Sequence, residues 1–211
     1  MTSVATDRDP ALAPPVATGV IHPLWVRLMH WINAGAMLVM IGSGWQIYNA
    51  SPLFGFTFPR GITLGGWLAG ALLWHFAAMW LLVANGMVYV MLGIATGRFR
   101  KKLFPIRPGQ VMADLGAALT LRLRYDDLST YNAVQKLFYV GVMLAGIVVV
   151  LSGLAIWKPI QLQELTALFG GYEAARYVHF FAMAAIVGFL LVHVLLAAIV
   201  PRSFRAMILG R

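Results

Sequence analysis

Four of the five histidines, His30, His75, His179 and His193, lie within long apolar stretches of the sequence. An imidazole in the hydrocarbon of a membrane costs free energy unless it has a partner, so an ionisable residue there indicates a functional site. His179 and His193 are fourteen residues apart, which in an α-helix is a rise of about 21 Å and a rotation about 40° short of four turns. Both rings therefore face one side of a single helix, one near each surface of a bilayer core about 30 Å thick. With the two other histidines they form two pairs of imidazoles, the ligand set of two six-coordinate haems.

The composition indicates a membrane protein and narrows the ligand chemistry. Of the 211 residues, 61% are hydrophobic and 11% are charged, whereas soluble domains carry about 25% charged residues. The chain has no cysteine, which excludes disulfides, iron–sulfur clusters, thiolate-ligated haem and covalent haem attachment. Of the haem ligands that remain, histidine is the obvious candidate and methionine is the second.

Four stretches are long enough to cross a bilayer as helices, which takes about 20 apolar residues. Lipid offers backbone groups no partner, so each stretch should be helical. The spans cover about 23–48, 65–92, 134–157 and 174–200. The sequence therefore predicts an all-α integral-membrane four-helix bundle. We expect residues 1–20 to form a disordered cytoplasmic tail.

The basic residues predict the orientation of the four spans. Most of them fall in the tail, in the loop between the second and third spans, and after the fourth span. Cytoplasmic loops carry the excess of Lys and Arg, so both termini should be cytoplasmic. The net charge of +9 is then a topology signal with some attraction to anionic membrane lipid. It is not the footprint of a nucleic-acid-binding protein.

The cytoplasmic loop 98–132 is the only sizeable segment expected outside the membrane. Val111, Leu115 and Leu119 recur in it every four residues. This spacing predicts a short amphipathic helix on the cytoplasmic surface.

The depth of each histidine in its span decides which rings pair. His30 lies about seven residues inside the cytoplasmic end of the first span, and His193 lies seven residues before that end of the fourth. His75 and His179 lie about ten and five residues below the external surface, a looser match by about 7 Å. Pairing His30 with His179 would need ligands in different leaflets. We therefore expect His30 and His193 to bind the iron of a cytoplasmic-side haem, and His75 and His179 that of an external-side haem. Two axial imidazoles leave no position for oxygen, which favours electron transfer.

Three further residues near the membrane surfaces have more than one interpretation. His22 is rotated about 80° from His30 on a helix, so we expect an interfacial structural role rather than ligation. Arg27 and Arg176 each precede a predicted ligand by three residues. They are candidates for cofactor binding through the haem propionates, and equally for interfacial anchors.

These residues resemble a known family. The run Arg27-Leu-Met-His30-Trp31, the central His75, the pair His179 and His193, and the segment Tyr131-Asn132-x-x-Gln135-Lys136 are similar to those of the bacterial cytochrome b561 and nickel–iron hydrogenase b-type cytochrome family. That family includes membrane subunits of formate dehydrogenase and thiosulfate reductase-like complexes. The resemblance covers about residues 20–206 and implies one cytochrome b membrane domain over 21–206.

The resemblance implies a conduit with two haem b groups in the bacterial inner membrane, between quinone or quinol and a periplasmic oxidoreductase. The chain would be an electron-transfer subunit of a respiratory complex rather than a free-standing enzyme. In similar complexes the quinone site lies beside the cytoplasmic-side haem. The external loops here have only about sixteen residues each, shorter than in the larger relatives. The partner is therefore open between a hydrogenase or formate dehydrogenase-like module and a smaller molybdenum enzyme or c-type cytochrome.

Two other functions compete with electron transfer. The first is a proton or cation transporter with a histidine relay, but transporters usually place carboxylates inside the membrane and these spans contain essentially none. The second is a membrane anchor subunit without an electron-transfer role, which has no use for four buried imidazoles.

Overall fold

The computed structural model describes residues 21–120 and 131–210, and within these ranges every regular element is a helix. The four long helices are α1 (Leu24–Ala50), α2 (Leu68–Ala95), α5 (Ala133–Trp157) and α7 (Tyr172–Ile199). Each is long and apolar enough to cross a membrane, which confirms the expected all-α membrane fold. The tail expected over 1–20 lies outside the described residues.

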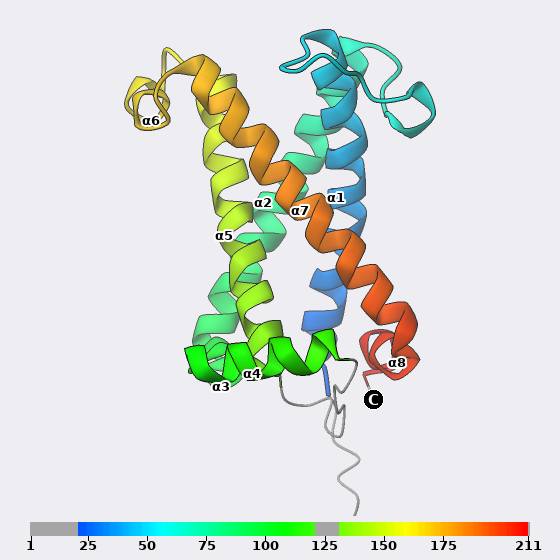
Figure 1. The fold of residues 1–211 in the computed structure, drawn as a ribbon. Coiled ribbons are helices and arrows are strands. Elements are labelled where there is room, and N and C mark those ends of the chain that lie inside the picture. The colour runs from blue at the N-terminus through cyan, green and yellow to red at the C-terminus, as the bar shows by residue number, and fades with distance from the viewer. Residues whose placement is uncertain (1–20, 121–130, 211) are drawn as a thin grey trace, which may run out of the picture.

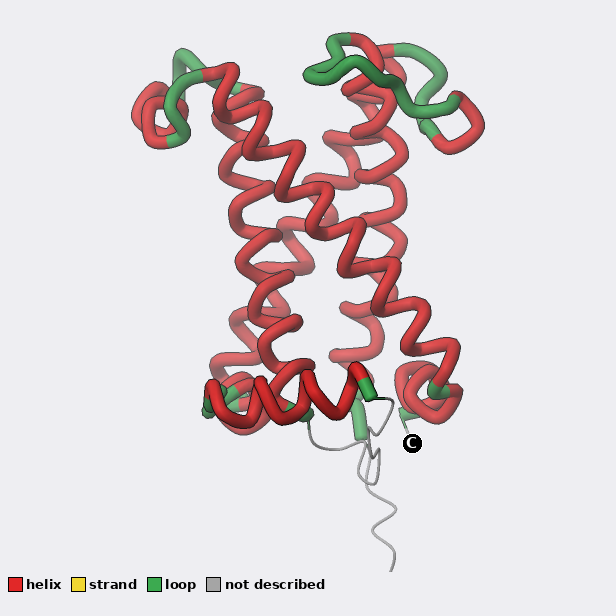
Figure 2. Tube along the Cα trace, viewed as in Figure 1, coloured by secondary structure: helices red, strands yellow, loops and turns green. Residues whose placement is uncertain are grey.

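The four long helices form two hairpins. α1 packs along α2, and α5 packs along α7, which crosses the bundle diagonally (Figure 1). The connection within each hairpin contains a short helix, η2 (Arg60–Ile62) in the first and α6 (Gln163–Leu168) in the second. Both connections lie at one end of the bundle, here called the opposite end. The other end, here called the basic end, carries α3 (Arg98–Leu103), α4 (Pro108–Leu119) and α8 (Pro201–Leu209). Between the two ends the described chain is helical throughout (Figure 2).

The second helix begins three residues later than the sequence indicates, and this changes the depth of His75. Gly65 and Gly66 have φ values of 106° and 72°, in the region that favours glycine because it lacks Cβ. They turn the chain so that α2 begins only at Leu68. His75 then lies seven residues from the start of α2, and His179 lies seven residues from the start of α7 at Tyr172. The two histidines nearer the opposite end are therefore at matching depths.

Small residues make the contacts inside the hairpins, and large apolar residues face outward. Ala71, Ala155 and Ala175 have no exposed surface, whereas Leu73 and Leu191 are 74% and 67% exposed. Membrane helices pack through small side chains because lipid is as apolar as leucine. The large outward side chains are the surface that lipid covers.

The loop between α2 and α5 lies across the basic end, as Figure 1 shows for α4. The predicted surface helix corresponds to α4 in the described part of this loop. Asp114 on α4 accepts a hydrogen bond from the backbone N–H of Ala133 at 2.7 Å. This bond joins α4 to the first residue of α5.

The first and last described residues meet at the basic end. The backbone N–H of Ile21 donates to the carbonyl of Gly210 at 2.8 Å. Arg27 donates to the carbonyl of Ile208 at 2.6 Å, and the indole of Trp31 donates to that of Met207 at 3.3 Å. α8 is therefore held against the first turns of α1.

The start of α5 is set by a capping box. The Asn132 side chain accepts from the backbone N–H of Gln135, and the Gln135 side chain accepts from the backbone N–H of Asn132. Asn132→Ala removes the first of these bonds and should lower the free energy of unfolding by about 1 kcal/mol. Denaturation of the purified, detergent-solubilised chain measures the change, with the exposed Gln110→Ala on α4 as control. Equal stability of the two variants would contradict the assignment.

Candidate functional site

The basic end of the bundle holds one pair of facing imidazoles. His30 lies six residues after the start of α1, and His193 lies six residues before the end of α7. Their ring centres are 6.0 Å apart, with an angle of 60° between the ring planes. Phe189 stacks on His193 at 5.6 Å, and Trp31 meets His30 edge-on at 5.3 Å. Aromatic side chains therefore hold both rings of this pair.

A second pair of imidazoles lies nearer the opposite end. The ring centres of His75 on α2 and His179 on α7 are 6.5 Å apart, and their planes are at 61°. The hydroxyl of Ser43 lies 3.0 Å from Nδ1 of His75, and that of Ser152 lies 3.2 Å from Nδ1 of His179. Both serines are fully buried. Each ring of this pair is thus held by a hydroxyl on the other helix of its own hairpin.

The spacing within each pair fits two imidazoles on one metal atom. An imidazole nitrogen lies about 2 Å from a metal that it binds, and the ring centre is about 1 Å behind that nitrogen, so two axial rings have centres about 6 Å apart. The observed separations of 6.0 and 6.5 Å agree with this value. Within the described residues no group of three or more His, Asp or Glu side chains gathers around a common point. The paired donors therefore suit a metal whose other ligands come from a macrocycle.

Arg27 places an unsatisfied polar atom one turn from His30. Its Nη1 donates to Ile208, but its buried Nε has no hydrogen-bond partner. A buried donor without an acceptor costs free energy. The position is therefore suited to an additional anionic oxygen such as that of a propionate.

Arg176 is engaged by the protein itself. Its Nη1 donates to Glu173 at 3.0 Å, and its Nη2 donates to the backbone and side-chain oxygens of Ser51 at 2.6 and 3.0 Å. Ser51 follows the last residue of α1. Arg176 thus joins α7 to the end of α1 at the opposite end.

His22 lies outside the membrane-spanning helices and belongs to neither pair. Arg98 donates to its Nδ1 at 3.3 Å. Burial and the nearby Arg98 lower the pKa of His22 to about 4, so its ring is neutral near pH 7. This contact joins the start of the described chain to α3.

An aromatic cluster closes the opposite end beside the second pair. Phe180, which follows His179, lies 5.4 Å from Tyr48 and 5.1 Å from Phe54 between ring centres. Tyr48 also meets Phe58 at 5.3 Å. These ring contacts join the end of α1 and its following loop to α7 at this end.

Ser43 and Ser152 were not predicted from the sequence as hydrogen-bond partners of histidine. Each is a hydroxyl inside an apolar span and each is followed by a glycine. This repeated Ser-Gly pair is the feature of the sequence from which the two serines could have been identified.

Comparison with known proteins identifies the family to which the chain belongs. The family model described as prokaryotic cytochrome b561 matches residues 21–210. A protein of Azospira oryzae that carries the provisional name of protein-methionine-sulfoxide reductase subunit YedZ1 is 52% identical over 190 residues, which are 90% of this chain and 96% of the relative. Both findings confirm the resemblance inferred from the sequence. This chain therefore belongs to the prokaryotic cytochrome b561 family of membrane proteins that bind b-type haem and transfer electrons.

Proposed function

We propose that this chain binds two haem b groups and carries electrons between the quinone pool and a periplasmic redox partner. The observation that carries the proposal is the meeting of four imidazoles as two facing pairs, His30 with His193 and His75 with His179. Each pair would hold one haem iron through its two imidazole nitrogens, and such ligation would favour electron transfer over oxygen chemistry. Bound haem supplies a one-electron centre at each pair, while the chain supplies ligands, spacing and an apolar surrounding.

The shared helix α7 sets the spacing of the two sites. His179 and His193 are about 21 Å apart along the helix, which covers most of a hydrocarbon core about 30 Å thick. The two sites are therefore at two levels of the membrane. This supports electron transfer across the membrane rather than along one surface.

The two arginines have different roles in this proposal. Arg27, with its buried and unpartnered Nε, would bind a propionate of a haem held by His30 and His193. The contacts of Arg176 with Ser51 and Glu173 favour the alternative role of an anchor at the membrane surface.

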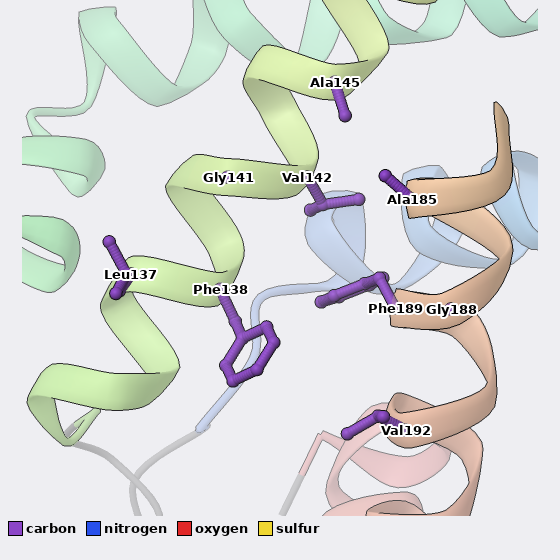
Figure 3. A pocket seen from close by; sticks show the side chains of 9 residues that line it. All are labelled: Leu137, Phe138, Gly141, Val142, Ala145, Ala185, Gly188, Phe189 and Val192. Atoms are coloured by element: carbon purple, nitrogen blue, oxygen red, sulfur yellow. The ribbon is translucent and has the colours of Figure 1, made fainter. Parts of the chain in front are cut away.

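A cleft beside His193 supports the assignment of a quinone. A cavity of about 520 Å³ lies between α5 and α7, and its lining residues are all apolar (Figure 3). A second, smaller cavity shares Phe138, Phe189 and Val192 with it and reaches His193. Gln135 and Tyr139 in this smaller cavity are polar groups that can bind a quinone carbonyl. The quinone ring therefore binds next to the haem at the basic end.

The partner is proposed from the relative's name. A subunit of a protein-methionine-sulfoxide reductase serves an enzyme that consumes electrons, because reduction of a sulfoxide to a thioether takes two electrons and two protons and releases water. By analogy, we expect quinol to be oxidised beside His193 and the electrons to leave at the end of the bundle nearer His75 and His179. The short connections at the opposite end favour a compact periplasmic reductase over a large hydrogenase module.

The orientation follows from the charges at the basic end. Arg98, Arg100, Lys101 and Lys102 lie on α3, and Arg202 and Arg205 lie on α8. Excess positive charge is cytoplasmic. The basic end with both chain termini therefore faces the cytoplasm of a bacterium.

Removal of a single ligand should remove a single haem. The purified chain should contain two haems, His193→Ala should lose the haem at the basic end, and His179→Ala should lose the other, as measured by pyridine haemochrome content per chain. His22→Ala is the matched control and should keep both. A wild-type chain with one haem or none contradicts the proposal. A colourless protein that moves protons or cations in liposomes would instead favour the transporter function.

Filling the cleft should block quinol oxidation without loss of haem. A Cβ at Gly141 or Gly188 would meet no atom within 4 Å, so Gly141→Leu and Gly188→Leu can begin a side chain there and reduce the volume of the cleft. The rate of haem reduction by a quinol analogue should fall at least tenfold, measured by stopped-flow absorbance, while haem content stays at two per chain. Gly35→Leu, at an exposed and equally open position on α1, should reduce normally. If the variants lose haem, the cleft belongs to the haem and not to a quinone.

The orientation can be measured with single cysteines, because the chain has none of its own. Ala113→Cys on α4 should react with a membrane-impermeant maleimide only after lysis of spheroplasts. Ile160→Cys, at a residue 82% exposed between α5 and α6, should react in intact spheroplasts. The reverse pattern would place the basic end in the periplasm.

A further inference from the structure

A serine followed by a glycine faces a histidine in each hairpin. Ser43 and Gly44 lie on α1 against His75 of α2, and Ser152 and Gly153 lie on α5 against His179 of α7. We call these two segments the Ser-Gly pairs. They belong to different hairpins, and both act on the rings of the pair nearer the opposite end.

The hydrogen of each serine is committed to its own helix. The Ser43 hydroxyl donates to the carbonyl of Val39 at 2.6 Å, and the Ser152 hydroxyl donates to that of Val148 at 2.7 Å. A hydroxyl has one hydrogen to donate and two lone pairs that accept. Toward the histidine each serine therefore acts as an acceptor, and the ring must present Nδ1–H. The proton on Nδ1 leaves the lone pair of Nε2 as the one that can bind a metal.

The glycine of each pair lets the ring approach the helix backbone. A Cβ at Gly44 would lie 3.4 Å from Cε1 of His75, in ordinary contact, whereas a Cβ at Gly153 would lie 3.1 Å from Cε1 of His179 and 3.4 Å from its Nδ1. The ring of His179 is therefore the more tightly confined. An added methyl group at Gly153 has to displace it.

The pair at the basic end has no such support. Among the described residues neither His30 nor His193 has a hydrogen bond to its ring, and their neighbours are the aromatic rings of Trp31 and Phe189. The two sites thus have the same ligands and different surroundings. A hydrogen bond on the distal N–H makes an imidazole a stronger ligand, and a stronger donor stabilises ferric iron more than ferrous iron.

We propose that the Ser-Gly pairs are positioning residues that fix the tautomer and ring orientation of His75 and His179 and lower the midpoint potential of the haem that these histidines bind. The inference rests on the proposed function, because it assumes a haem at each pair. It goes further by assigning roles to four residues and by making the two haems unequal for a stated reason.

The test replaces each serine and reads both haems separately. In Ser43→Ala and Ser152→Ala, the midpoint potential of the haem at His75 and His179 should rise, its affinity should fall about ten- to hundredfold, and its ferric EPR g-values should change. The haem at His30 and His193 should keep its potential and spectrum and is an internal reference. His193→Ala and His179→Ala, which retain one haem each, assign the two signals. Ser43→Thr and Ser152→Thr keep the hydroxyl and should restore wild-type values.

The glycines provide a second test that does not remove a hydrogen bond. Gly153→Ala should shift the EPR signal of the same haem, Gly44→Ala should shift it less, and Gly35→Ala on the exposed side of α1 should leave it unchanged. This series remains informative if a serine variant fails to fold. Equal shifts of both haems in the serine variants, or no shift of either, would overturn the role of the Ser-Gly pairs. A wild-type chain without two haems would overturn the proposed function itself.

Discussion

The free energy of placing an imidazole in hydrocarbon is the constraint on which this structure depends. Each neutral ring carries one N–H and one lone pair, and neither finds water inside a bilayer. For His75 and His179, the hydroxyls of Ser43 and Ser152 accept the N–H. The lone pair that remains is then available to iron. In the proposed arrangement, the hydrogen bond inside each hairpin satisfies the N–H of the ring, and a metal bound between the hairpins would satisfy its lone pair.

The contacts within the hairpins and the polar contacts between them lie in different parts of the bundle. The close helix contacts are within the hairpins, between α1 and α2 and between α5 and α7. Polar contacts between the hairpins lie at the ends, where Arg27 holds Ile208 of α8 and Arg176 holds Ser51 after α1. The facing histidines lie between these two arginine contacts. The ends therefore set the separation of the hairpins, and the middle keeps room for a flat group between two rings.

Much of this arrangement could be predicted from the sequence because it depends on length and rise. The four spans follow from apolar length, and the depth of a histidine follows from the constant rise of a helix. Depth in the membrane alone predicts the same two histidine pairs whose ring centres lie 6.0 and 6.5 Å apart in the structure. The remaining mismatch at His75 came from the glycine turn that delays α2 to Leu68, which an apolar count does not detect.

The contacts between helices could not be predicted in the same way. That Ser43 faces His75 depends on the rotation of α1 about its axis, and this rotation is set by packing against α2. The contacts of Arg176 depend on where α1 ends, and those of Arg27 depend on α8, nearly the whole chain away. For these residues the chemical type can be predicted from the sequence, whereas the hydrogen-bond partner depends on the fold.

The division of ligands between the hairpins has a consequence for biogenesis. The first hairpin carries one histidine of each pair, and α7 carries both of the others. A ribosome delivers α1 and α2 to the membrane long before α7, so during translation neither half-site has its second ligand. If each pair holds a haem as proposed, cofactor insertion at both levels must wait for the last transmembrane segment, and a chain truncated before α7 would be released with neither pair complete.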